Sequence, residues 1–234
     1  MNNTNDDLNM KIALFDFCET LVNFQTADRY IEYVVQNKKK NVNDIFLNGI
    51  ICVFGSNYIR KLFYKLFHFN IKKCLLLLRI KGMDKQELTN IAHKYYIDVI
   101  KPNLIMNMID KLLEYKRNGY RIAIVSAGYD IYLKYFVNDF NINDLLANKL
   151  LFDENNIFTG KCVQPNCYGE NKVLYLKKYY GVSSMNNIES VAFSDSPSDI
   201  PFLKFAKDSI VVAKESVYPN WAKKNNFKVF NWKE

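Results

Sequence analysis

The chain has 234 residues, of which 49% are hydrophobic and 24% are charged, and its formal net charge is +8. This composition excludes a largely disordered chain, which would have far fewer apolar side chains. It indicates one large globular domain, or a core with a smaller inserted domain.

The chain contains no apolar run of membrane-spanning length. Its longest runs, Ile50–Phe54 and Cys74–Leu78, have five residues each, whereas a bilayer span needs about 20. The first ten residues are polar and acidic and lack the basic-then-apolar order of a secretory signal. We therefore expect a cytoplasmic protein. Five cysteines without a Cys-x-x-Cys pair, with only two histidines, favour free thiols over a disulfide framework or a zinc site.

Short apolar runs of one form recur along the chain. They are Lys11–Phe17, Arg121–Ser126, Ser190–Phe193 and Ser209–Ala213. Their length and β-branched content predict strands that are buried on both faces of a parallel sheet. Apolar residues recur at helical spacing between these runs. One such stretch ends at Gly119, one begins after Gly128 and one ends at Gly181. The alternation predicts an α/β fold with a Rossmann-like, doubly wound parallel sheet. Lys149–Phe152 and Ile157–Cys162, separated by a polar turn, predict an appended β-hairpin.

One long segment departs from this alternation. Residues 23–101 are rich in aromatic side chains, helical in period and without a convincing strand signal. The segment follows the first predicted strand and ends before Pro102. We therefore predict a core domain of residues 1–22 and 102–234, and an inserted α-helical domain of residues 23–101.

The inserted segment holds the whole positive excess, with 14 basic and six acidic residues, while the rest of the chain has 18 of each. A basic surface favours an anionic partner, namely nucleic acid, an acidic lipid surface or a phosphorylated substrate; the alternative is a solvated, lysine-rich face. Residues 45–80 interleave apolar and basic side chains in a way compatible with contact with a membrane surface, but a helical core with a solvated basic face is the favoured interpretation. No recognised nucleic-acid module occurs, so we expect no specific nucleic-acid partner.

Carboxylates follow two of the predicted strands. Asp16 lies at the end of the first strand and Asp195 at the end of a later one, and ligands of open α/β sheets bind outside these strand ends. Two carboxylates that meet there repel each other unless a divalent cation lies between them, and Mg²⁺ prefers carboxylate, water and phosphate oxygens. Asp199, four residues after Asp195, is a further candidate for direct or water-mediated metal binding. The alternative for each acid is a helix cap.

Ser126 and Lys172 are candidates for binding an anion. Ser126, also at a predicted strand end, offers a hydroxyl beside the backbone N–H groups of Ala127 and Gly128. Such N–H groups are suitable donors to a phosphate at a helix N-terminus. Lys172 could neutralise the same anion, or it could be a solvated lysine. Each residue alone is weak support for a site.

Taken in chain order, these residues resemble the four motifs of the haloacid dehalogenase (HAD) superfamily. The matching segments are Asp16–Leu21 (DFCETL), Ser126, Lys172 and Ser194–Pro201 (SDSPSDIP). Residues 23–101 occupy the place of the family's helical C1-type cap. Ala147–Leu150 and Thr159–Lys161 are similar to the phosphoserine phosphatase-like branch, subfamily IB.

The resemblance implies a Mg²⁺-dependent phosphatase that acts on a small phosphorylated substrate. Asp16 would attack phosphorus and form an aspartyl-phosphate, which water then cleaves. Ser126 and Lys172, with the N–H groups of Ala127 and Gly128, would hold the phosphoryl oxygens. The implied metal ligands are Asp16, the backbone carbonyl of Cys18, Asp195 and, in an assisting role, Asp199.

Cys18 departs from the family pattern, because phosphatases of this family have an aspartate there that donates and accepts protons. A thiol with a pKa of about 8.5 replaces that carboxyl poorly near neutral pH. We expect slow turnover of alkyl phosphates, and a smaller loss with acyl or aryl phosphates, whose leaving groups need no acid. The alternatives are a phosphate-ligand binding protein without turnover and phosphonatase-like chemistry, which needs a cap lysine that the sequence does not single out.

Gln25 bears on the substrate. It stands where phosphoserine phosphatases have a glutamate that meets the substrate ammonium group, and a neutral amide cannot form that ion pair. We therefore expect a substrate other than phosphoserine, for example a sugar phosphate, a nucleotide or a lipid phosphate.

Overall fold

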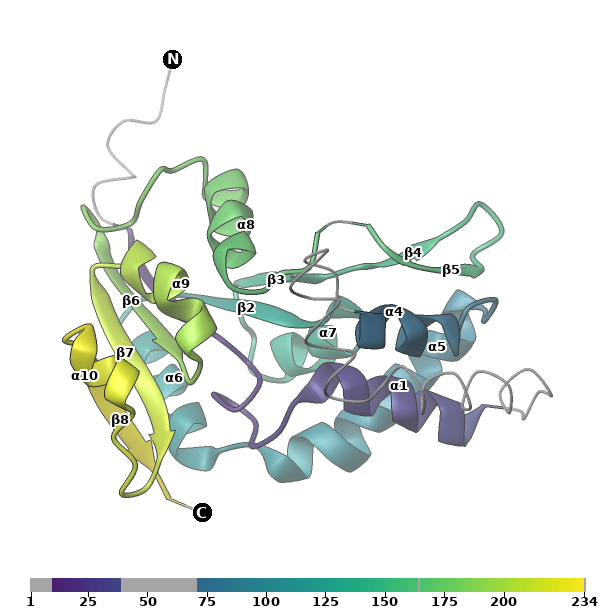
Figure 1. Ribbon diagram of the computed structural model, residues 1–234, viewed down its shortest axis with the longest axis horizontal. Coiled ribbons are helices and arrows are strands. Elements are labelled where there is room, and N and C mark those ends of the chain that lie inside the picture. The colour runs from purple at the N-terminus through teal and green to yellow at the C-terminus, as the bar shows by residue number, and fades with distance from the viewer. Residues whose placement is uncertain (1–9, 39–70, 164, 234) are drawn as a thin grey trace.

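A computed structural model describes residues 10–38, 71–163 and 165–233 of the chain. Six parallel strands form one sheet in the order β3-β2-β1-β6-β7-β8 (Figure 1). The strands are β1 (Lys11–Phe15), β2 (Arg121–Tyr129), β3 (Asp144–Asn148), β6 (Glu189–Ser194), β7 (Asp208–Lys214) and β8 (Lys228–Trp232). The predicted α/β fold is confirmed.

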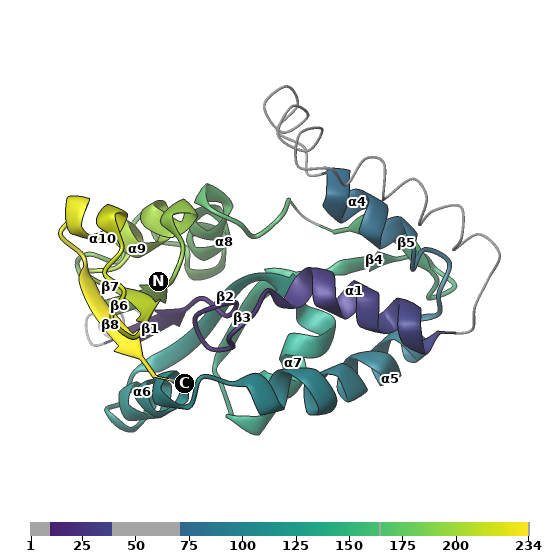
Figure 2. The ribbon, with the colours of Figure 1, turned by 60° about the horizontal axis from the view of Figure 1, so that its bottom comes forward.

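Helices cover both faces of this sheet, as Figure 2 shows. The helices α6 (Met106–Arg117) and α7 (Asp130–Asp139) lie on one face, and α8 (Glu170–Tyr180), α9 (Ile200–Phe205) and α10 (Asn220–Lys224) lie on the other. Successive strand residues point to opposite faces, so each central strand supplies two cores. In β1, Ala13 and Phe15 pack into the first core, and Ile12 and Leu14 pack into the second. The strands are apolar throughout for this reason.

The four predicted strands are confirmed as β1, β2, β6 and β7, and the predicted hairpin as β4 (Leu150–Phe152) and β5 (Phe158–Cys162). The edge strands β3 and β8 were not predicted. Both contain polar residues that interrupt the apolar pattern of a central strand. Asp144 and Asn148 begin and end β3, where they are buried and hydrogen-bonded, and Lys228 and Asn231 are exposed in β8. Helix α8 ends at Gly181, which adopts φ = 69° as a left-handed cap.

The described parts of the inserted segment are helical. They form α1 (Thr26–Asn37), α4 (Ile71–Leu78), α5 (Lys85–Tyr95) and the short turns η2 (Tyr96–Ile100) and η3 (Lys101–Asn103). Their buried side chains join the same apolar cluster as α6 and α7. Residues 39–70, which hold most of the proposed membrane-contacting stretch, lie outside the described residues. The division into two domains remains a prediction.

The hairpin β4–β5 is attached to the inserted segment by backbone hydrogen bonds. Gly82 N donates to Phe158 O at 2.9 Å, Phe158 N donates to Met83 O at 2.9 Å, and Lys85 N donates to Asn156 O at 2.9 Å. These bonds connect the hairpin to the inserted segment. Both lie at the end of the molecule away from β8 (Figure 1).

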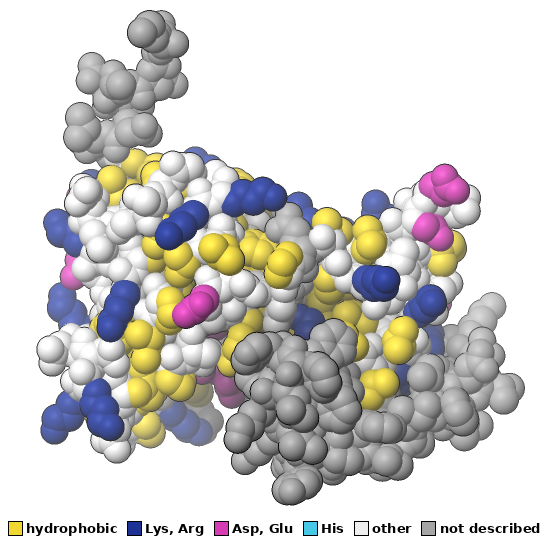
Figure 3. Space-filling view, turned by 45° about the horizontal axis from the view of Figure 1, so that its top comes forward, with side chains coloured by type: hydrophobic (Ala, Val, Ile, Leu, Met, Phe, Trp, Pro, Cys, Tyr) yellow, Lys and Arg dark blue, Asp and Glu magenta, His cyan; other side chains and the backbone are white. Residues whose placement is uncertain are grey.

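Within the described ranges, no helix is long and apolar enough to cross a membrane. On the face shown in Figure 3, lysine and arginine side chains are scattered over the described surface rather than gathered in one patch. This distribution gives no support on that face for a single basic docking surface.

Candidate active site

Asp16 and Lys172 form the centre of a buried ion cluster at the carboxyl ends of the strands. Asp16 directly follows β1, and its backbone N–H donates to Phe193 O of the adjacent strand β6 at 2.9 Å. Lys172 Nζ donates to Asp16 Oδ1 at 2.6 Å and to Asp199 Oδ2 at 2.5 Å. All three residues are at least 94% buried. The three side chains therefore lie together at one edge of the sheet.

The charge of this cluster shifts the pKa values of its members. Burial raises the pKa of Asp16 to about 6, although Lys172 acts in the opposite direction. Burial also opposes the charge on Lys172, but Asp16 and Asp199 outweigh it and hold the lysine pKa above its usual value. The two carboxylates therefore favour the charged form of Lys172 beside Asp16.

Asp195 lies next to this cluster and is linked to it through Thr20. Thr20 Oγ1 is 3.4 Å from Asp16 Oδ2 and 3.3 Å from Asp195 Oδ1. Burial, Asp16 and Glu19 raise the pKa of Asp195 to about 8. The two carboxylates thus share one hydroxyl donor, and no positive side chain bonded to Asp195 appears among the described contacts.

The loop that contains Asp195 and Asp199 holds the carboxylate of Asp199 in place. Ser194 Oγ donates to Asp199 Oδ2 at 2.7 Å, and Ser196 Oγ accepts from Ser198 N at 3.3 Å. Asp199 ends a short 3-10 turn and is the N-cap position of α9, one residue before the helix. Asp199 thus occupies a helix-cap position, the alternative that the sequence left open, but its side chain makes no cap hydrogen bond.

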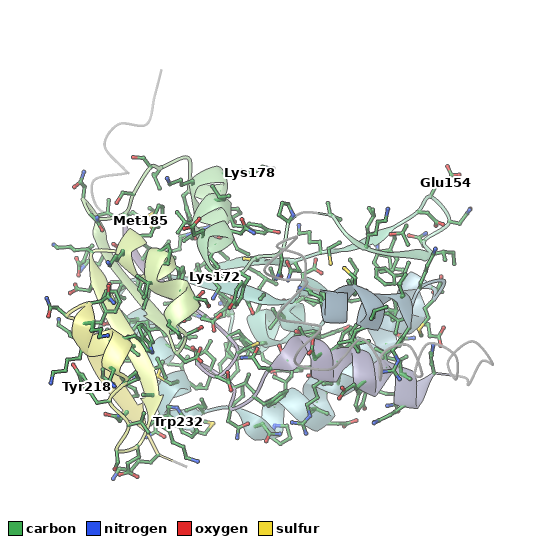
Figure 4. All side chains as sticks on the ribbon, in the orientation of Figure 1. Glu154, Lys172, Lys178, Met185, Tyr218 and Trp232 are labelled. Atoms are coloured by element: carbon green, nitrogen blue, oxygen red, sulfur yellow. The ribbon has the colours of Figure 1, made fainter. Side chains whose placement is uncertain are left out.

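Helix α8 brings Lys172 to the site because its N-terminus packs closely against this loop. Gly169, just before the helix, adopts φ = 56°, and a Cβ there would lie 3.3 Å from Ser198 O. In Figure 4, Lys172 lies at the inner end of α8 and Lys178 lies nearer its outer end. A glycine at position 169 therefore permits both the backbone turn and the close approach.

Ser126 lies inside β2, where the strand bulges rather than ends. Ser126 is fully buried, and its Oγ accepts from Gly128 N at 3.0 Å. The pairing with β3 is interrupted between Ser126 and Tyr129, so Ala127 and Gly128 leave the ladder. A Cβ at Gly128 would lie 2.6 Å from Tyr132 Oη. The loop of residues 126–128 thus turns tightly at the edge where Asp16 lies.

Cys18 is buried, and its thiol faces the inserted segment. Its Sγ lies 3.1 Å from Thr26 Oγ1 and accepts from Thr26 N at 3.5 Å. Thr26 Oγ1 is in turn 2.7 Å from Tyr132 Oη. Burial and the nearby Asp16 raise the pKa of Cys18 to about 12. The side chain is therefore a neutral thiol at physiological pH.

Gln25 is exposed, and it pairs with a residue that the sequence analysis did not single out. Gln25 Nε2 donates to Glu19 Oε2 at 2.5 Å. Glu19 also contributes to the raised pKa of Asp195, so this pair lies on the Asp195 side of the site. A carboxylate is thus present beside Gln25, and the amide alone does not exclude an ammonium group from this region.

The side chains fit a divalent cation in charge and in chemistry. One ammonium group, that of Lys172, faces Asp16 and Asp199, and Asp195 adds a third carboxylate. Asp199 Oδ1 is buried and has no hydrogen-bond partner. Within the described ranges, no three Asp, Glu, His or Cys side chains form a ready-made metal cluster. A Mg²⁺ ion bound here would therefore combine carboxylate oxygens with backbone, water and phosphate oxygens, as Mg²⁺ commonly does.

The comparisons with known proteins agree with the fold and the site. The sequence profile of the haloacid dehalogenase-like hydrolase family matches residues 13–204, and the chain belongs to this family. It is 26% identical over 200 residues to the phosphoserine phosphatase of Methanocaldococcus jannaschii, with 84% of this chain and 82% of that protein covered. The predicted resemblance to phosphoserine phosphatases of this superfamily is confirmed, and the chain is an enzyme of a hydrolase family.

Solved structures share this fold. A protein of unknown function from Bordetella pertussis Tohama I superposes with a TM-score of 0.76 at 18% identity, with 95% of this chain and 99% of that chain covered. A phospho-aspartyl intermediate analogue of a phosphoserine phosphatase superposes with a TM-score of 0.57 at 19% identity, with 94% and 92% covered.

Sequence reasoning missed four polar residues around the site. They are Thr20, Glu19, Ser194 and Asn148. Thr20, Glu19 and Ser194 lie inside the segments that resemble the first and fourth motifs, and this position is the sequence signal for them. Asn148 lies at the end of an unpredicted strand, and its contact with Ala127 joins residues that are distant in sequence.

Proposed function

We propose that this enzyme is a phosphatase that removes a phosphoryl group from a small phosphorylated metabolite through an aspartyl-phosphate at Asp16. The observation that carries the proposal is the buried Lys172 ammonium, which lies 2.6 Å from Asp16 Oδ1 at the edge of the sheet. A positive charge beside a carboxylate suits an anionic reacting group. The phospho-aspartyl analogue of a related phosphoserine phosphatase supports the same chemistry.

In the proposed reaction, an oxygen of Asp16 attacks phosphorus, and the bond between phosphorus and the leaving oxygen breaks. Water then attacks phosphorus and releases phosphate and the free carboxylate. Lys172 and the hydroxyl of Ser126 hold the phosphoryl oxygens, with the N–H groups of Ala127 and Gly128 as further donors. These side chains are fixed by burial, so little reorganisation accompanies the reaction.

We propose Mg²⁺ as the cofactor of this site. Asp16, Asp195 and the backbone carbonyl of Cys18 would hold it, with Asp199 assisting. When bound, the ion offsets the negative charge of the phosphoryl group and of the carboxylates around it. The raised pKa of Asp195 and the unpartnered Asp199 Oδ1 support this assignment, because both indicate too little positive charge at the site.

The thiol of Cys18 makes this phosphatase weak in acid–base catalysis. A group with a pKa of about 12 that is already paired with Thr26 is a poor proton donor to a leaving oxygen and a poor base for water. Substrates whose leaving oxygen needs no proton, such as acyl and aryl phosphates, should therefore react best.

The test is hydrolysis of p-nitrophenyl phosphate and acetyl phosphate, with magnesium and with a chelator, by the wild type and by Asp16→Asn. The amide has the same shape as the carboxylate but cannot act as the nucleophile. We expect turnover by the wild type with magnesium and none by Asp16→Asn. Equal turnover by both proteins would disprove the proposal.

A second function rests on the same observation about Cys18. A chain that binds a phosphorylated ligand but does not hydrolyse it needs Lys172 and Ser126 and does not need a proton donor. Tight binding of inorganic phosphate by the wild type, together with no turnover of either substrate, would favour this function. Phosphonatase-like chemistry remains the other alternative from the sequence, and its required lysine is not identified among the described residues.

A further inference from the structure

Asn148 is a buried amide that the proposed reaction does not use, although it lies directly behind the loop of residues 126–128. It is 1% exposed at the end of β3. Its Nδ2 donates to Ala127 O at 2.5 Å and to Asn166 Oδ1 at 2.8 Å, and its Oδ1 accepts from Cys167 N at 2.9 Å. One side chain therefore joins this loop to the segment that leads into α8.

The bulge in β2 explains why Ala127 needs this partner. Ser126 pairs with Ala147 and Tyr129 pairs with Asn148, so the residues between them leave the ladder. A partly buried carbonyl without a donor is costly, and the side chain of Asn148 supplies the donor that the strand cannot. The orientation of the amide is fixed, because the opposite orientation would place its oxygen against two carbonyl oxygens.

The same network reaches the inserted helices. Lys73 Nζ, from α4, donates to Asn166 Oδ1 at 2.7 Å and lies 5.1 Å from the centroid of the Tyr129 ring. Asn166 Oδ1 thus accepts from Lys73 and from Asn148 at the same time. Asn166 O also accepts from Asn171 Nδ2 at 2.9 Å, and Asn171 is the neighbour of Lys172.

We infer that Asn148 and Asn166 are positioning residues that couple Lys73 of the inserted segment to the loop of residues 126–128. The inference rests on the proposed function, in which this loop holds the phosphoryl group. Neither amide touches that group. They act through Ala127 O, whose position sets the direction of the next N–H group, that of Gly128, which donates to Ser126 Oγ at 3.0 Å. A charged donor at one end of a hydrogen-bonded chain strengthens the bonds that follow.

A competing explanation is that Lys73 attracts the phosphoryl group directly through its charge. The two explanations differ in whether the effect of Lys73 passes through Asn148. Direct attraction is independent of Asn148, whereas the coupling requires it. A double-mutant cycle on these two residues separates them.

The experiment measures binding of inorganic phosphate by calorimetry to the wild type, Lys73→Met, Asn148→Leu and the double variant. We expect each single variant to raise Kd roughly tenfold, the equivalent of one hydrogen bond. The double variant should bind no worse than Asn148→Leu. A Kd of the double variant roughly hundredfold above that of the wild type, which is the product of the two single effects, would overturn the inference. Lys94→Met, which removes an exposed charge on α5, is the matched control and should bind as the wild type does.

Steady-state kinetics with p-nitrophenyl phosphate distinguish positioning from a general loss of folded protein. We expect KM to rise with the phosphate Kd, while kcat stays within about twofold of the wild-type value. A lower kcat at unchanged KM would indicate only fewer folded molecules and would overturn the inference. Asn166→Leu breaks the same chain at another residue and serves if Asn148→Leu does not fold.

NMR of the protein without phosphate tests the coupling independently of the proposed function. The amide nitrogen of Gly128 follows Ala127 O directly, so its chemical shift reports the hydrogen bond to that oxygen. Lys73→Met should shift this resonance in the wild type but not in Asn148→Leu. If the Gly128 resonance shifts in the wild type and not in Asn148→Leu while no phosphate binds, the proposed function fails and the coupling stands. If the resonance does not move, the coupling is overturned whatever the phosphate result.

Discussion

The thiol of Cys18 lies 3.1 Å from Thr26 Oγ1, and the backbone N–H of Thr26, the first residue of α1, points to the same sulfur at 3.5 Å. Position 18 thus contacts the start of the inserted segment at two atoms. The N-terminus of a helix carries a partial positive charge, so this position favours a negatively charged acceptor. A carboxylate could replace the sulfur in this contact.

Cys18→Asp should therefore increase phosphatase activity. The carboxylate would accept from the same Thr26 donors and would supply the proton donor and base that the thiol lacks. We expect an increase in kcat for an alkyl phosphate of about 10²–10⁴-fold, measured by phosphate release. Cys18→Asn has the same shape without a titrating group and should stay near the wild-type rate. A gain of the same size in Cys18→Asn would show that the thiol is not the limitation.

Lys172→Met should abolish most of the activity. The substitution leaves Asp16 and Asp199 buried without the ammonium that bonds to both, and removes a charge proposed to hold the phosphoryl group. We expect kcat/KM to fall about 10²–10³-fold or more, as for loss of one strong donor to a reacting oxyanion. Lys178→Met, in the last turn of the same helix, is the control and should leave kcat/KM unchanged. A mild effect of Lys172→Met would argue against its proposed role.

Gly128→Ala should destabilise the protein through Tyr132. The new Cβ would lie 2.6 Å from Tyr132 Oη and 3.1 Å from Leu133 Cδ1, and Tyr132 is held by its contact with Thr26. Overpacking of this kind costs about 1–3 kcal/mol of unfolding free energy, measurable by denaturant titration. Tyr132→Phe in the same protein removes the clashing oxygen and should recover part of the loss. No recovery in the double variant would contradict this explanation.

Arg121→Met should shift the acid unfolding of the protein to higher pH. Asp144 is buried, which raises its pKa, but bonds from Arg121, Tyr179 and Tyr180 outweigh this and hold the pKa below its usual value of 3.8. A depressed pKa stabilises the fold above the unfolded value, and this contribution is lost as pH falls through the folded value. Without Arg121 the folded pKa rises, so less stabilisation remains and it is lost at higher pH.

The measurement for Arg121→Met is the unfolding free energy from pH 7 down to pH 2, followed by circular dichroism. We expect a loss of about 1–3 kcal/mol at neutral pH, as for a charged hydrogen bond removed from a buried partner. The difference from the wild type should shrink as Asp144 becomes protonated in both proteins. Lys228→Met removes an exposed partner of Asp208 and should have a much smaller effect. A difference that persists at pH 2 would point to lost packing instead.

Gln25→Glu should improve activity towards phosphoserine relative to p-nitrophenyl phosphate. A carboxylate at position 25 can pair with a substrate ammonium group, and a charged hydrogen bond of this kind corresponds to roughly tenfold or more in kcat/KM. The ratio of kcat/KM for the two substrates in each protein is the measurement. Efficient hydrolysis of phosphoserine by the wild type would show that Glu19, which is already bonded to Gln25, meets the ammonium group.

The sequence by itself determined the fold class and the positions of Asp16 and Asp195 at the ends of two predicted strands. Strands buried on both faces must be apolar throughout, and this leaves a signal in any single run of residues. Motif residues at the ends of such strands meet because parallel strands end at one edge. These features are local, or follow from the topology alone.

The tertiary structure alone decided how those residues are connected. The raised pKa of Cys18 and the link between Asp16 and Asp195 through Thr20 depend on contacts made only in the folded chain. So do the hydrogen bonds that run from Lys73 through Asn166 and Asn148 to Ala127. Hydrogen bonds and charge interactions act over a few ångströms in space and leave no periodic pattern along the sequence. The residues that bind can therefore be recognised in the chain, whereas the contacts that position them appear only once it is folded.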